Sequence, residues 1–167
     1  GVLAAGTTGE GPLLTDEQYS RTVKTSVQAA DGQMCVIAGA SESSAVRALR
    51  VIEIAAKPGA DAVLVLPPYY FRSGNVDTVA YFSELARESS LPILIYNFPR
   101  IVGQAVTARE IDALVQQEKI VGMKDSSGAM TTFNHLVAAY GSSEFKVVQG
   151  LATLAYQSLC MGAAGFF

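Results

Sequence analysis

The chain has 167 residues, half of them hydrophobic, and a net charge of -3 at pH 7. Its lysines and arginines are scattered without a basic stripe, which argues against a nucleic-acid partner, and no apolar run approaches the roughly 18 residues that predict a membrane span. We therefore expect one sizeable core in a cytoplasmic protein. An organelle leader is an alternative, because the sequence does not open on Met.

Strand and helix signals alternate along the chain with short links between them. Short apolar runs predict buried strands, and longer amphipathic segments predict helices. Two helices open on a capping box, Thr15 with Gln18 and Thr107 with Glu110. In chain order we expect a strand at 2–5, a helix at 15–30, a strand at 34–38, a helix at 43–57, a strand at 62–66, a helix at 75–88, a strand at 92–96, a helix at 107–118, a strand at 120–124, a helix at 131–140, a strand at 145–149, a helix at 151–161 and a strand at 164–167.

Apolar strands joined by helices predict a parallel α/β sheet covered by helices. The pattern leaves a doubly wound sheet and a (β/α)8 TIM barrel as alternatives. A barrel typically needs about 250 residues. In the barrel interpretation, residues 1–167 are a single partial TIM-barrel domain, truncated so that the first strand and helix and the last helix are missing.

Unusual polar residues follow the strands rather than precede them. The carboxyl ends of parallel strands share one edge, where both barrels and open α/β sheets bind ligands. We therefore expect the segments after the strands to form one site. These segments are 6–10, 67–70, 96–99, 124–126 and 149–150.

Lys124 ends an apolar run and is the strongest single candidate for chemistry. A lysine is almost never fully buried unless it is paired or functional, and desolvation disfavours the ammonium form, which frees the amine as a nucleophile. Alternation predicts that Lys124 shares a strand face with Gly122 and Ile120, opposite Val121 and Met123. Gly122 is expected to leave open space for a carbonyl substrate. The alternative is a head group that reaches solvent at the strand end.

Three further segments offer polar groups, each with a structural alternative. Thr7 and Thr8 lie in a Gly-rich loop that can present N–H groups and hydroxyls to a small anion or form an ordinary turn. Tyr96 is expected on the face that carries the lysine, where a phenol relays protons or packs in the core. Tyr70, after two prolines, lines a pocket or packs against another subunit. For Asp125 we favour capping of its turn.

Four motifs carry a family resemblance. Gly-Thr-Thr-Gly-Glu at 6–10, Pro-Pro-Tyr-Tyr at 67–70, Tyr-Asn-Phe-Pro at 96–99 and Gly-Met-Lys-Asp at 122–125 resemble, in order and spacing, the dihydrodipicolinate synthase/N-acetylneuraminate lyase family. The resemblance covers residues 1–167. It implies a (β/α)8 barrel and a class I aldolase or lyase that needs neither a metal nor another cofactor.

The resemblance also implies roles for individual residues. Lys124 would form a Schiff base with pyruvate or another 2-oxo acid, and Tyr96 would shuttle protons. Thr7 and Thr8 would hold the substrate carboxylate, with Thr7 also in a hydroxyl relay. Tyr70 would reach across a subunit interface, as in tetrameric members, so we expect a homo-oligomer, a dimer or a tetramer.

The acceptor end of the expected site departs from the family pattern. Gly150 would line this end, and Ile101 stands where synthases that use aspartate semialdehyde carry an arginine; Arg100 is one position short. We therefore expect a catabolic 2-oxo acid aldolase, acting on 4-hydroxy-2-oxoglutarate or a 2-keto-3-deoxy acid. One alternative is 4-hydroxy-tetrahydrodipicolinate synthase, which joins pyruvate to aspartate semialdehyde in lysine biosynthesis. A non-catalytic small-molecule-binding barrel, or an inactive fragment, is another.

The remaining titratable candidates are interpreted as structural. Cys35 and Cys160 lie far apart in apolar surroundings and predict reduced core residues. His135 lies in a helical pattern and predicts a surface or packing residue. Because histidines and carboxylates do not cluster at the strand ends, a metal-dependent aldolase is disfavoured.

Overall fold

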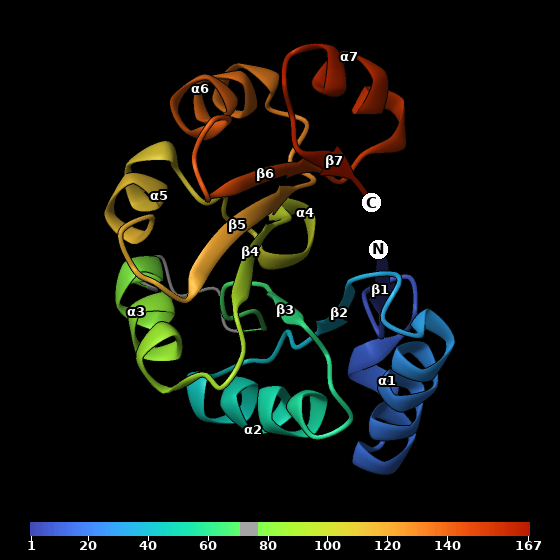
Figure 1. Ribbon diagram of the computed structural model, residues 1–167. Coiled ribbons are helices and arrows are strands. Elements are labelled where there is room, and N and C mark those ends of the chain that lie inside the picture. The colour runs from blue at the N-terminus through green and yellow to red at the C-terminus, as the bar shows by residue number, and fades with distance from the viewer. Residues whose placement is uncertain (71–76) are drawn as a thin grey trace.

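The fold is a single parallel sheet whose seven strands follow one another in chain order, β1-β2-β3-β4-β5-β6-β7. The computed structural model describes residues 1–70 and 77–167. Figure 1 shows the sheet curling so that β1 and β7 approach each other, with the larger helices on its outer side. In the described part of the chain no ladder joins β7 to β1, so the seven strands form an open, curled sheet.

All seven strands fall where the apolar runs predicted them. Each is short, and every neighbouring pair is parallel, which requires a crossover between successive strands. The strands are β1 (Val2–Ala4), β2 (Val36–Gly39), β3 (Ala62–Val65), β4 (Ile93–Asn97), β5 (Ile120–Asp125), β6 (Lys146–Gln149) and β7 (Gly165–Phe166).

The crossovers carry the expected helices, together with short ones that the sequence did not predict. The capping boxes at Thr15 and Thr107 are both present. The helices are η1 (Gly11–Leu13), α1 (Asp16–Ala30), α2 (Ala45–Ala56), α3 (Thr78–Glu88), α4 (Pro99–Val102), α5 (Ala108–Leu114), α6 (Met130–Tyr140), η2 (Ala152–Leu154) and α7 (Ala155–Cys160). Helix α3 is capped by the Asp77 side chain, and residues 75 and 76, where it was expected to begin, lie outside the described residues. None of the described helices combines the length and apolar character needed to cross a bilayer.

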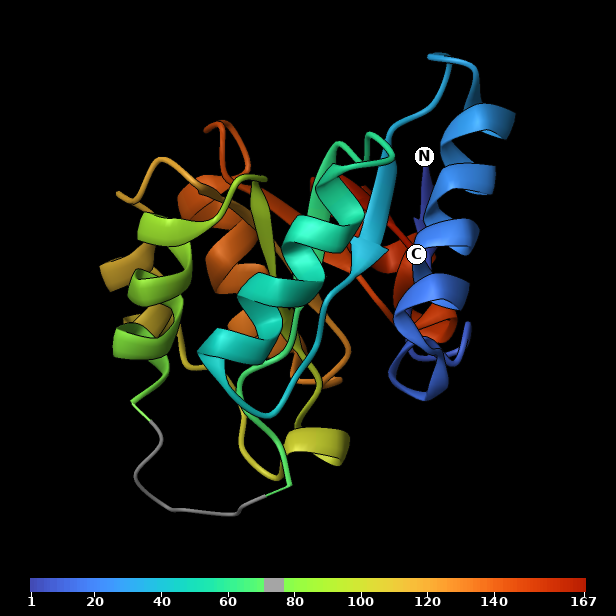
Figure 2. The ribbon, with the colours of Figure 1, turned by 90° about the horizontal axis from the view of Figure 1, so that it is seen from below.

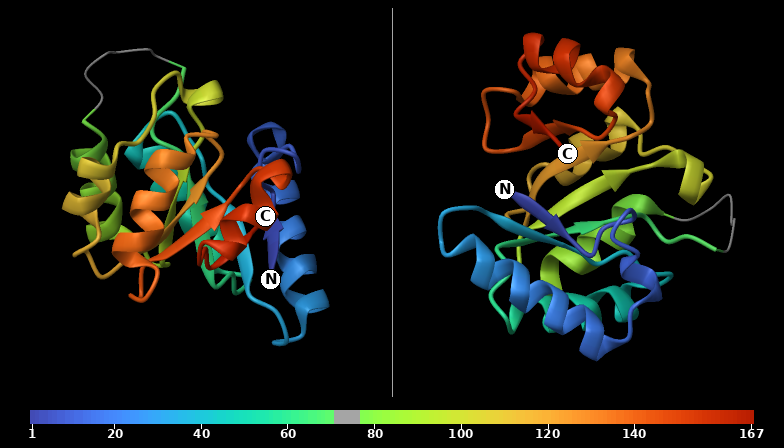
Figure 3. Two further views of the ribbon diagram at one scale, coloured as in Figure 1. Left: turned by 90° about the horizontal axis from the view of Figure 1, so that it is seen from above. Right: turned by 90° about the vertical axis from the view of Figure 1, so that its right-hand side faces the viewer.

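The short helices missed from sequence lie at the ends of strands. Helix α4 follows β4 directly and begins with Pro99, a residue favoured at the first helical position. Its four residues are too few for a periodic signal. Figures 2 and 3 show α4 at the same end of the sheet as the loop after β1. The structure thus gathers the strand-end segments on one side, as expected.

Two hydrophobic clusters lie on opposite faces of the sheet. The larger cluster joins the outward strand residues, such as Val63 and Ile95, to helix residues such as Ile52 and Phe82. The smaller cluster lines the concave face and contains Leu64, Leu94 and Tyr96, among others. The concave face formed by β3 and β4 is therefore apolar below the strand ends.

The expected alternation along β5 is wrong at its start, because the ladder with β4 is irregular. Ile93 pairs with Ile120, but Leu94 pairs with Gly122, so Val121 has no opposite residue. Such a bulge reverses the facing of the residues before it. Ile120 accordingly joins Met123 in the helix-side cluster, and Val121 packs against the concave-face cluster. Beyond the bulge, Lys124 and Gly122 share the concave side as predicted.

The cysteines also differ from expectation. Cys35 and Cys160 are both free thiols, but both are exposed rather than buried. Their apolar neighbours in sequence did not predict burial, because each cysteine lies at the end of an element. Cys35 comes just before β2, and Cys160 is the last residue of α7. His135 is exposed on α6, as a surface residue.

Candidate active site

Lys124 and Tyr96 lie directly opposite each other on neighbouring strands. They are register partners in the β4–β5 ladder, so their side chains project from the same face. Lys124 Nζ lies 4.5 Å from the centroid of the Tyr96 ring and 5.9 Å from that of the Phe167 ring. An amine within reach of a phenol is an arrangement suited to covalent catalysis with proton transfer.

Lys124 is buried, with 7% of its surface exposed. Among the described residues, no carboxylate forms an ion pair with Lys124. The alternative of a head group in solvent is therefore wrong. A lysine buried against aromatic rings without a counter-ion is an uncommon structural residue, which supports a chemical role.

The next residue on each strand forms a buried polar clamp on the opposite face. Asn97 Nδ2 donates to Asp125 Oδ1 over 2.6 Å, and Asn97 Oδ1 accepts from the backbone N–H of Val106 over 2.9 Å. Asp125 also accepts from the Ser127 hydroxyl over 2.9 Å. These bonds anchor the loops that leave β4 and β5, and they confirm a capping role for Asp125.

Burial dominates the electrostatics of the clamp. Asp125 is almost fully buried, and desolvation raises the pKa of its carboxyl above the ordinary value of 3.8, against the opposing effect of the hydrogen bonds from Ser127 and Asn97. Burial thus makes the charged form of the Asp125 carboxyl less favourable than it is in water.

Strand β6 continues the same polar row. Gln149 pairs with Asp125 in the ladder. Its Oε1 accepts from the backbone N–H groups of Gly150 and Leu151, both over 2.9 Å, and its Nε2 donates to Ser158 over 2.9 Å. The fully buried side-chain amide of Gln149 therefore holds the turn at Gly150 in place.

Gly150 lies beside the lysine arm. A Cβ built on Gly150 would overlap the Ser126 hydroxyl oxygen and lie 2.9 Å from Lys124 Cε. Glycine is required here because the two side chains occupy the space that any larger residue would fill. Gly150 thus borders the amine at the strand ends.

The expectation for Gly122 is wrong. A Cβ at this position would overlap the carbonyl oxygen of Lys146 on β6, so Gly122 permits close approach of the neighbouring strand and leaves no open space for substrate. Glycine in a strand often marks such a close backbone approach. Its role in the structure is to let β5 and β6 pair beneath the lysine.

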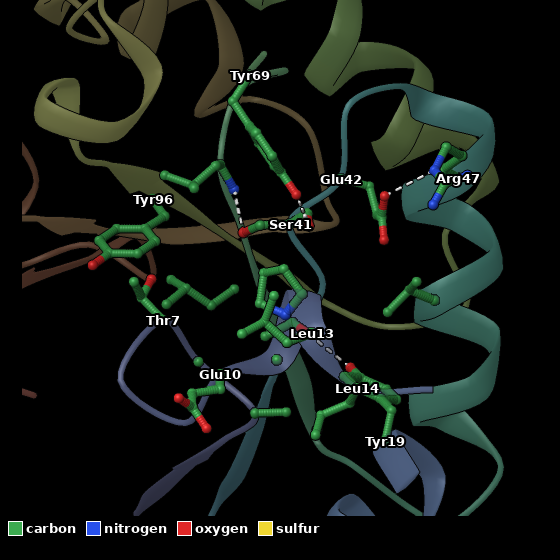
Figure 4. A pocket seen from close by; sticks show the side chains of 18 of the residues that line it. Thr7, Glu10, Leu13, Leu14, Tyr19, Ser41, Glu42, Arg47, Tyr69 and Tyr96 are labelled. Carbon is green, nitrogen blue, oxygen red and sulfur yellow. Dashed lines mark hydrogen bonds and ion pairs between the residues drawn. The ribbon is translucent and has the colours of Figure 1, made fainter. Parts of the chain in front are cut away.

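A cavity of about 400 Å³ opens beside Tyr96. Thr7, Tyr96 and Ile101 line one end of it, and Figure 4 shows the Thr7 and Tyr96 side chains approaching each other there. Lys124 is not among the lining residues, but its amine lies 4.5 Å from the centroid of the Tyr96 ring, which is. Thr7 and Tyr96 therefore share one cavity within a single chain.

Polar side chains also line the far end of the cavity. Glu42 accepts from Arg47 over 2.9 Å, and the Tyr69 hydroxyl donates to the Ser41 carbonyl over 3.2 Å, as Figure 4 shows. Burial raises the pKa of the Tyr69 phenol. The bond from Tyr69 ties the loop after β3 to the loop after β2 at the cavity wall.

Two predicted site residues, Thr8 and Tyr70, are not among the residues that line the cavity. Thr8 is exposed. Tyr70 is 82% exposed and adopts a left-handed backbone conformation, with φ at 85°.

Ile101 and Arg100 are neighbours in sequence but lie in different surroundings. Ile101 lines the cavity, whereas Arg100 is exposed and does not. Successive residues of a helix differ in direction by about 100°, and α4 turns its second residue outward. The side chain at the cavity wall is therefore the apolar one.

Sequence reasoning missed two polar residues of the site. Asn97 was seen only as part of a motif, and Ser126 only as the end of a segment, although both are almost fully buried. Their positions one residue after Tyr96 and two after Lys124 carry the only available signal, since residue facing alternates at a strand end. In the described part of the chain, no three His, Cys, Asp or Glu residues gather in a way that would hold a metal ion.

Comparisons with known proteins identify the family to which the chain is similar. The sequence model of the Dihydrodipicolinate synthetase family matches residues 1–167. A 4-hydroxy-tetrahydrodipicolinate synthase of Methanoculleus marisnigri is 30% identical over 165 residues, which are 99% of this chain and 56% of the relative. The enzyme of the same name from Cereibacter sphaeroides is 37% identical over 150 residues, 90% of this chain and 51% of the relative.

A solved structure shows the same fold. The chloride-inhibited dihydrodipicolinate synthase of Acinetobacter baumannii, complexed with pyruvate, superposes with a TM-score of 0.92 at 28% identity and covers 99% of this chain and 56% of its own. This chain spans about half the length of the curated relatives it matches.

Proposed function

The chain belongs to the dihydrodipicolinate synthetase family, and on that premise we propose that its protein is a class I aldolase or lyase that makes or breaks a carbon–carbon bond between pyruvate and an aldehyde. The observation that carries the proposal is the opposed pair Lys124 and Tyr96, with the amine 4.5 Å from the phenol ring. The pyruvate complex of the Acinetobacter baumannii relative supports pyruvate as the 2-oxo acid.

The chemistry follows from this pair. Lys124 Nζ attacks the ketone carbon of pyruvate, and loss of water leaves a protonated imine. The imine draws electrons from the methyl group, which releases a proton and becomes an enamine carbon. This carbon attacks the aldehyde carbon, the aldehyde oxygen takes up a proton, and water then frees the product from the lysine. Tyr96 carries protons between these steps, and Thr7, beside it at the cavity, holds the substrate carboxylate.

The aldehyde is assigned from the relatives. Both named relatives are 4-hydroxy-tetrahydrodipicolinate synthases, which supports aspartate semialdehyde as the acceptor. This agrees better with the alternative expectation from the sequence than with the catabolic aldolase first expected.

A second candidate function remains because of one observation. Ile101, not Arg100, lines the cavity beside Thr7 and Tyr96, and an apolar side chain cannot make the charge-assisted contact that would hold a second carboxylate. This favours a 4-hydroxy-2-oxo acid or 2-keto-3-deoxy acid as the compound cleaved.

The proposal extends to the assembly. We regard the seven strands as part of an eight-stranded (β/α)8 barrel in which residues 1–167 are a single partial domain; the unbroken strand order and the similarity to barrel enzymes support this. A homodimer or homotetramer would place the exposed Tyr70 in a neighbouring subunit's site.

Covalent trapping tests the function. The parent protein for this test is the longest natural chain that contains residues 1–167. Incubation with pyruvate and borohydride is expected to attach a reduced pyruvyl group to Lys124, detected by peptide mass spectrometry. Lys124→Met is expected to abolish both trapping and turnover, and the control Lys146→Met, which replaces an exposed lysine on β6, is expected to retain both. Labelling at another lysine, or metal-dependent turnover that survives Lys124→Met, would overturn the proposal.

A further inference from the structure

Ala5 has a backbone conformation that is unusual for an alanine. It follows β1 directly and is buried, and its φ is 50°, in the left-handed region that residues with a Cβ rarely adopt. Such a conformation costs free energy, persists only where the surrounding structure imposes it, and is common at active sites. Ala5 is also the last residue before the loop that carries Thr7. The strained residue therefore stands at the entrance to that loop.

Two glycines pack closely against the carbonyl group of Ala5. A Cβ built on Gly39, the last residue of β2, would overlap the Ala5 carbonyl oxygen, and so would a Cβ built on Gly11, the first residue of η1. The obstructing atom belongs to the backbone, so a larger residue at either position would have to displace the peptide group that joins Ala5 to Gly6. The two glycines thus enclose the Ala5 carbonyl and impose its direction.

Gly39 is itself held in place. Its carbonyl oxygen accepts from the hydroxyl of Tyr19 over 2.9 Å, and Tyr19 is buried on α1. The preceding residue, Ala38, pairs with Ala4 in the β1–β2 ladder. The end of β2 is therefore fixed both by a helix and by the neighbouring strand, and the Ala5 carbonyl packs against a rigid partner.

The direction of the Ala5 carbonyl sets the position of Thr7. The loop after Ala5 is short and bonded to itself, because the Gly11 N–H donates to the Gly6 carbonyl over 3.1 Å. Thr7 lies two residues beyond Ala5 and lines the cavity together with Tyr96, where Figure 4 shows the two side chains approaching each other. Displacing the peptide group after Ala5 would therefore move Thr7 relative to Tyr96.

We propose that Gly39 is a positioning residue, which encloses the Ala5 carbonyl and so holds Thr7 where its hydroxyl donates to the carboxylate of a 2-oxo acid bound to Lys124. The inference rests on the proposed function. Gly39 acts through Thr7 rather than on the substrate. Its absence of a side chain is therefore needed to bind a ketone that carries a carboxylate, and is not needed for a ketone without one.

Trapping of two ketones on Lys124 with borohydride tests this without turnover. The probes are pyruvate and methyl pyruvate, whose ester lacks the negative charge, and the readout is the ratio of their concentrations at half-maximal trapping. The parent, the longest natural chain that contains residues 1–167, is expected to prefer pyruvate. Gly39→Ala and Thr7→Ala are each expected to reduce this preference by about 10-fold, the value of one hydrogen bond to a charged group.

A double variant and a control complete the experiment. Gly39→Ala combined with Thr7→Ala is expected to reduce the preference no further than either change alone, because both remove the same contact. The control Gly165→Ala also adds a methyl group to a strand glycine, but its Cβ has no neighbour within 4 Å. It is expected to keep the preference of the parent.

The outcomes separate the two proposals. No trapping of pyruvate on Lys124 in the parent would refute the proposed function. Trapping in the parent with an unchanged preference in Gly39→Ala or in Thr7→Ala would overturn only the role of Gly39. An equal loss for both ketones in Gly39→Ala, or additive losses in the double variant, would overturn it too, since Gly39 would then act by another route.

A milder variant serves if Gly39→Ala fails to fold. Tyr19→Phe removes only the hydroxyl that donates to the Gly39 carbonyl and keeps the buried ring. It is expected to reduce the preference for pyruvate by a smaller factor than Thr7→Ala does. An unchanged preference in Tyr19→Phe would overturn the role of Gly39.

Discussion

Asn97 and Asp125 are joined by a buried hydrogen bond of 2.6 Å across strands β4 and β5, one residue beyond the opposed pair Tyr96 and Lys124. The two pairs point to opposite faces of the sheet. The outer pair fixes the ends of both strands, and this holds the lysine and the tyrosine in register on the inner face.

Asn97→Ala is expected to lower the free energy of unfolding of the parent protein by about 1–3 kcal/mol, because the Asp125 carboxylate and the Val106 N–H lose a buried partner. Urea denaturation measures this change. Asn134→Ala is a matched control, since the side-chain oxygen of Asn134 has no hydrogen-bond partner in the described part of the chain. An equal loss of unfolding free energy in the two variants would show that the hydrogen bonds of Asn97 add nothing to stability beyond the loss of an amide side chain.

Stability is expected to depend on the ionisation of Asp125. Burial raises the folded-state pKa of its carboxyl above 3.8, so the folded protein holds this proton more tightly than the unfolded chain does. The contribution to stability is then largest at low pH and declines as pH rises above 3.8 through the folded-state pKa. The free energies of unfolding of Asp125→Asn and of the parent are measured from pH 4 to pH 7. The value of the variant minus that of the parent is expected to increase as pH rises, because only the parent loses stability when Asp125 ionises. A difference that is flat, or that falls, would contradict the direction.

Tyr96→Phe is expected to lower kcat by about 10²–10⁴-fold, the contribution typical of general acid–base catalysis, with a much smaller change in KM. Steady-state kinetics with pyruvate and the acceptor measure both. Tyr81→Phe is the control, because Tyr81 is also buried but packs on helix α3 among helix-side residues. Activity within a few-fold of the parent would make Tyr96 a packing residue.

Gly150→Ala is expected to reduce the rate of pyruvate trapping on Lys124. The added methyl group meets the Ser126 hydroxyl and lies 2.9 Å from Lys124 Cε, a separation that requires the lysine arm to move. Gly165→Ala makes the same change on β7, where a Cβ has no neighbour within 4 Å. Quenched trapping time courses compare the two, and similar rates in both variants would rule out crowding at Gly150.

Ile101 is expected to set the preference for the acceptor. Ile101→Arg should raise kcat/KM for aspartate semialdehyde relative to an aldehyde without a carboxylate by about 10–100-fold, the value of a hydrogen bond to a charged group. Arg100→Ala should leave the ratio unchanged, because Arg100 lies outside the cavity lining. Loss of aspartate semialdehyde activity in Arg100→Ala would show that Arg100 reaches the substrate after all.

Much of the architecture follows from the order of residues. Apolar runs such as 62–66 predict strands by composition and length, and capping boxes at Thr15 and Thr107 mark helix starts by local hydrogen bonding. Short helices carry no such signal, and α4 was missed because four residues do not complete a periodic pattern.

The sequence by itself determined the alternation of strands and helices and the presence of a lysine, a tyrosine and two threonines at strand ends, because these depend on neighbours within a few positions. Only the tertiary structure decided that Val121 bulges out of the ladder, that the backbone of Lys146 occupies the space beside Gly122, and that the Ser126 hydroxyl has no hydrogen-bond partner in the described residues. The physical reason is that register, close approach and hydrogen-bond satisfaction are set by strands far apart in the sequence, whose contacts no local pattern records.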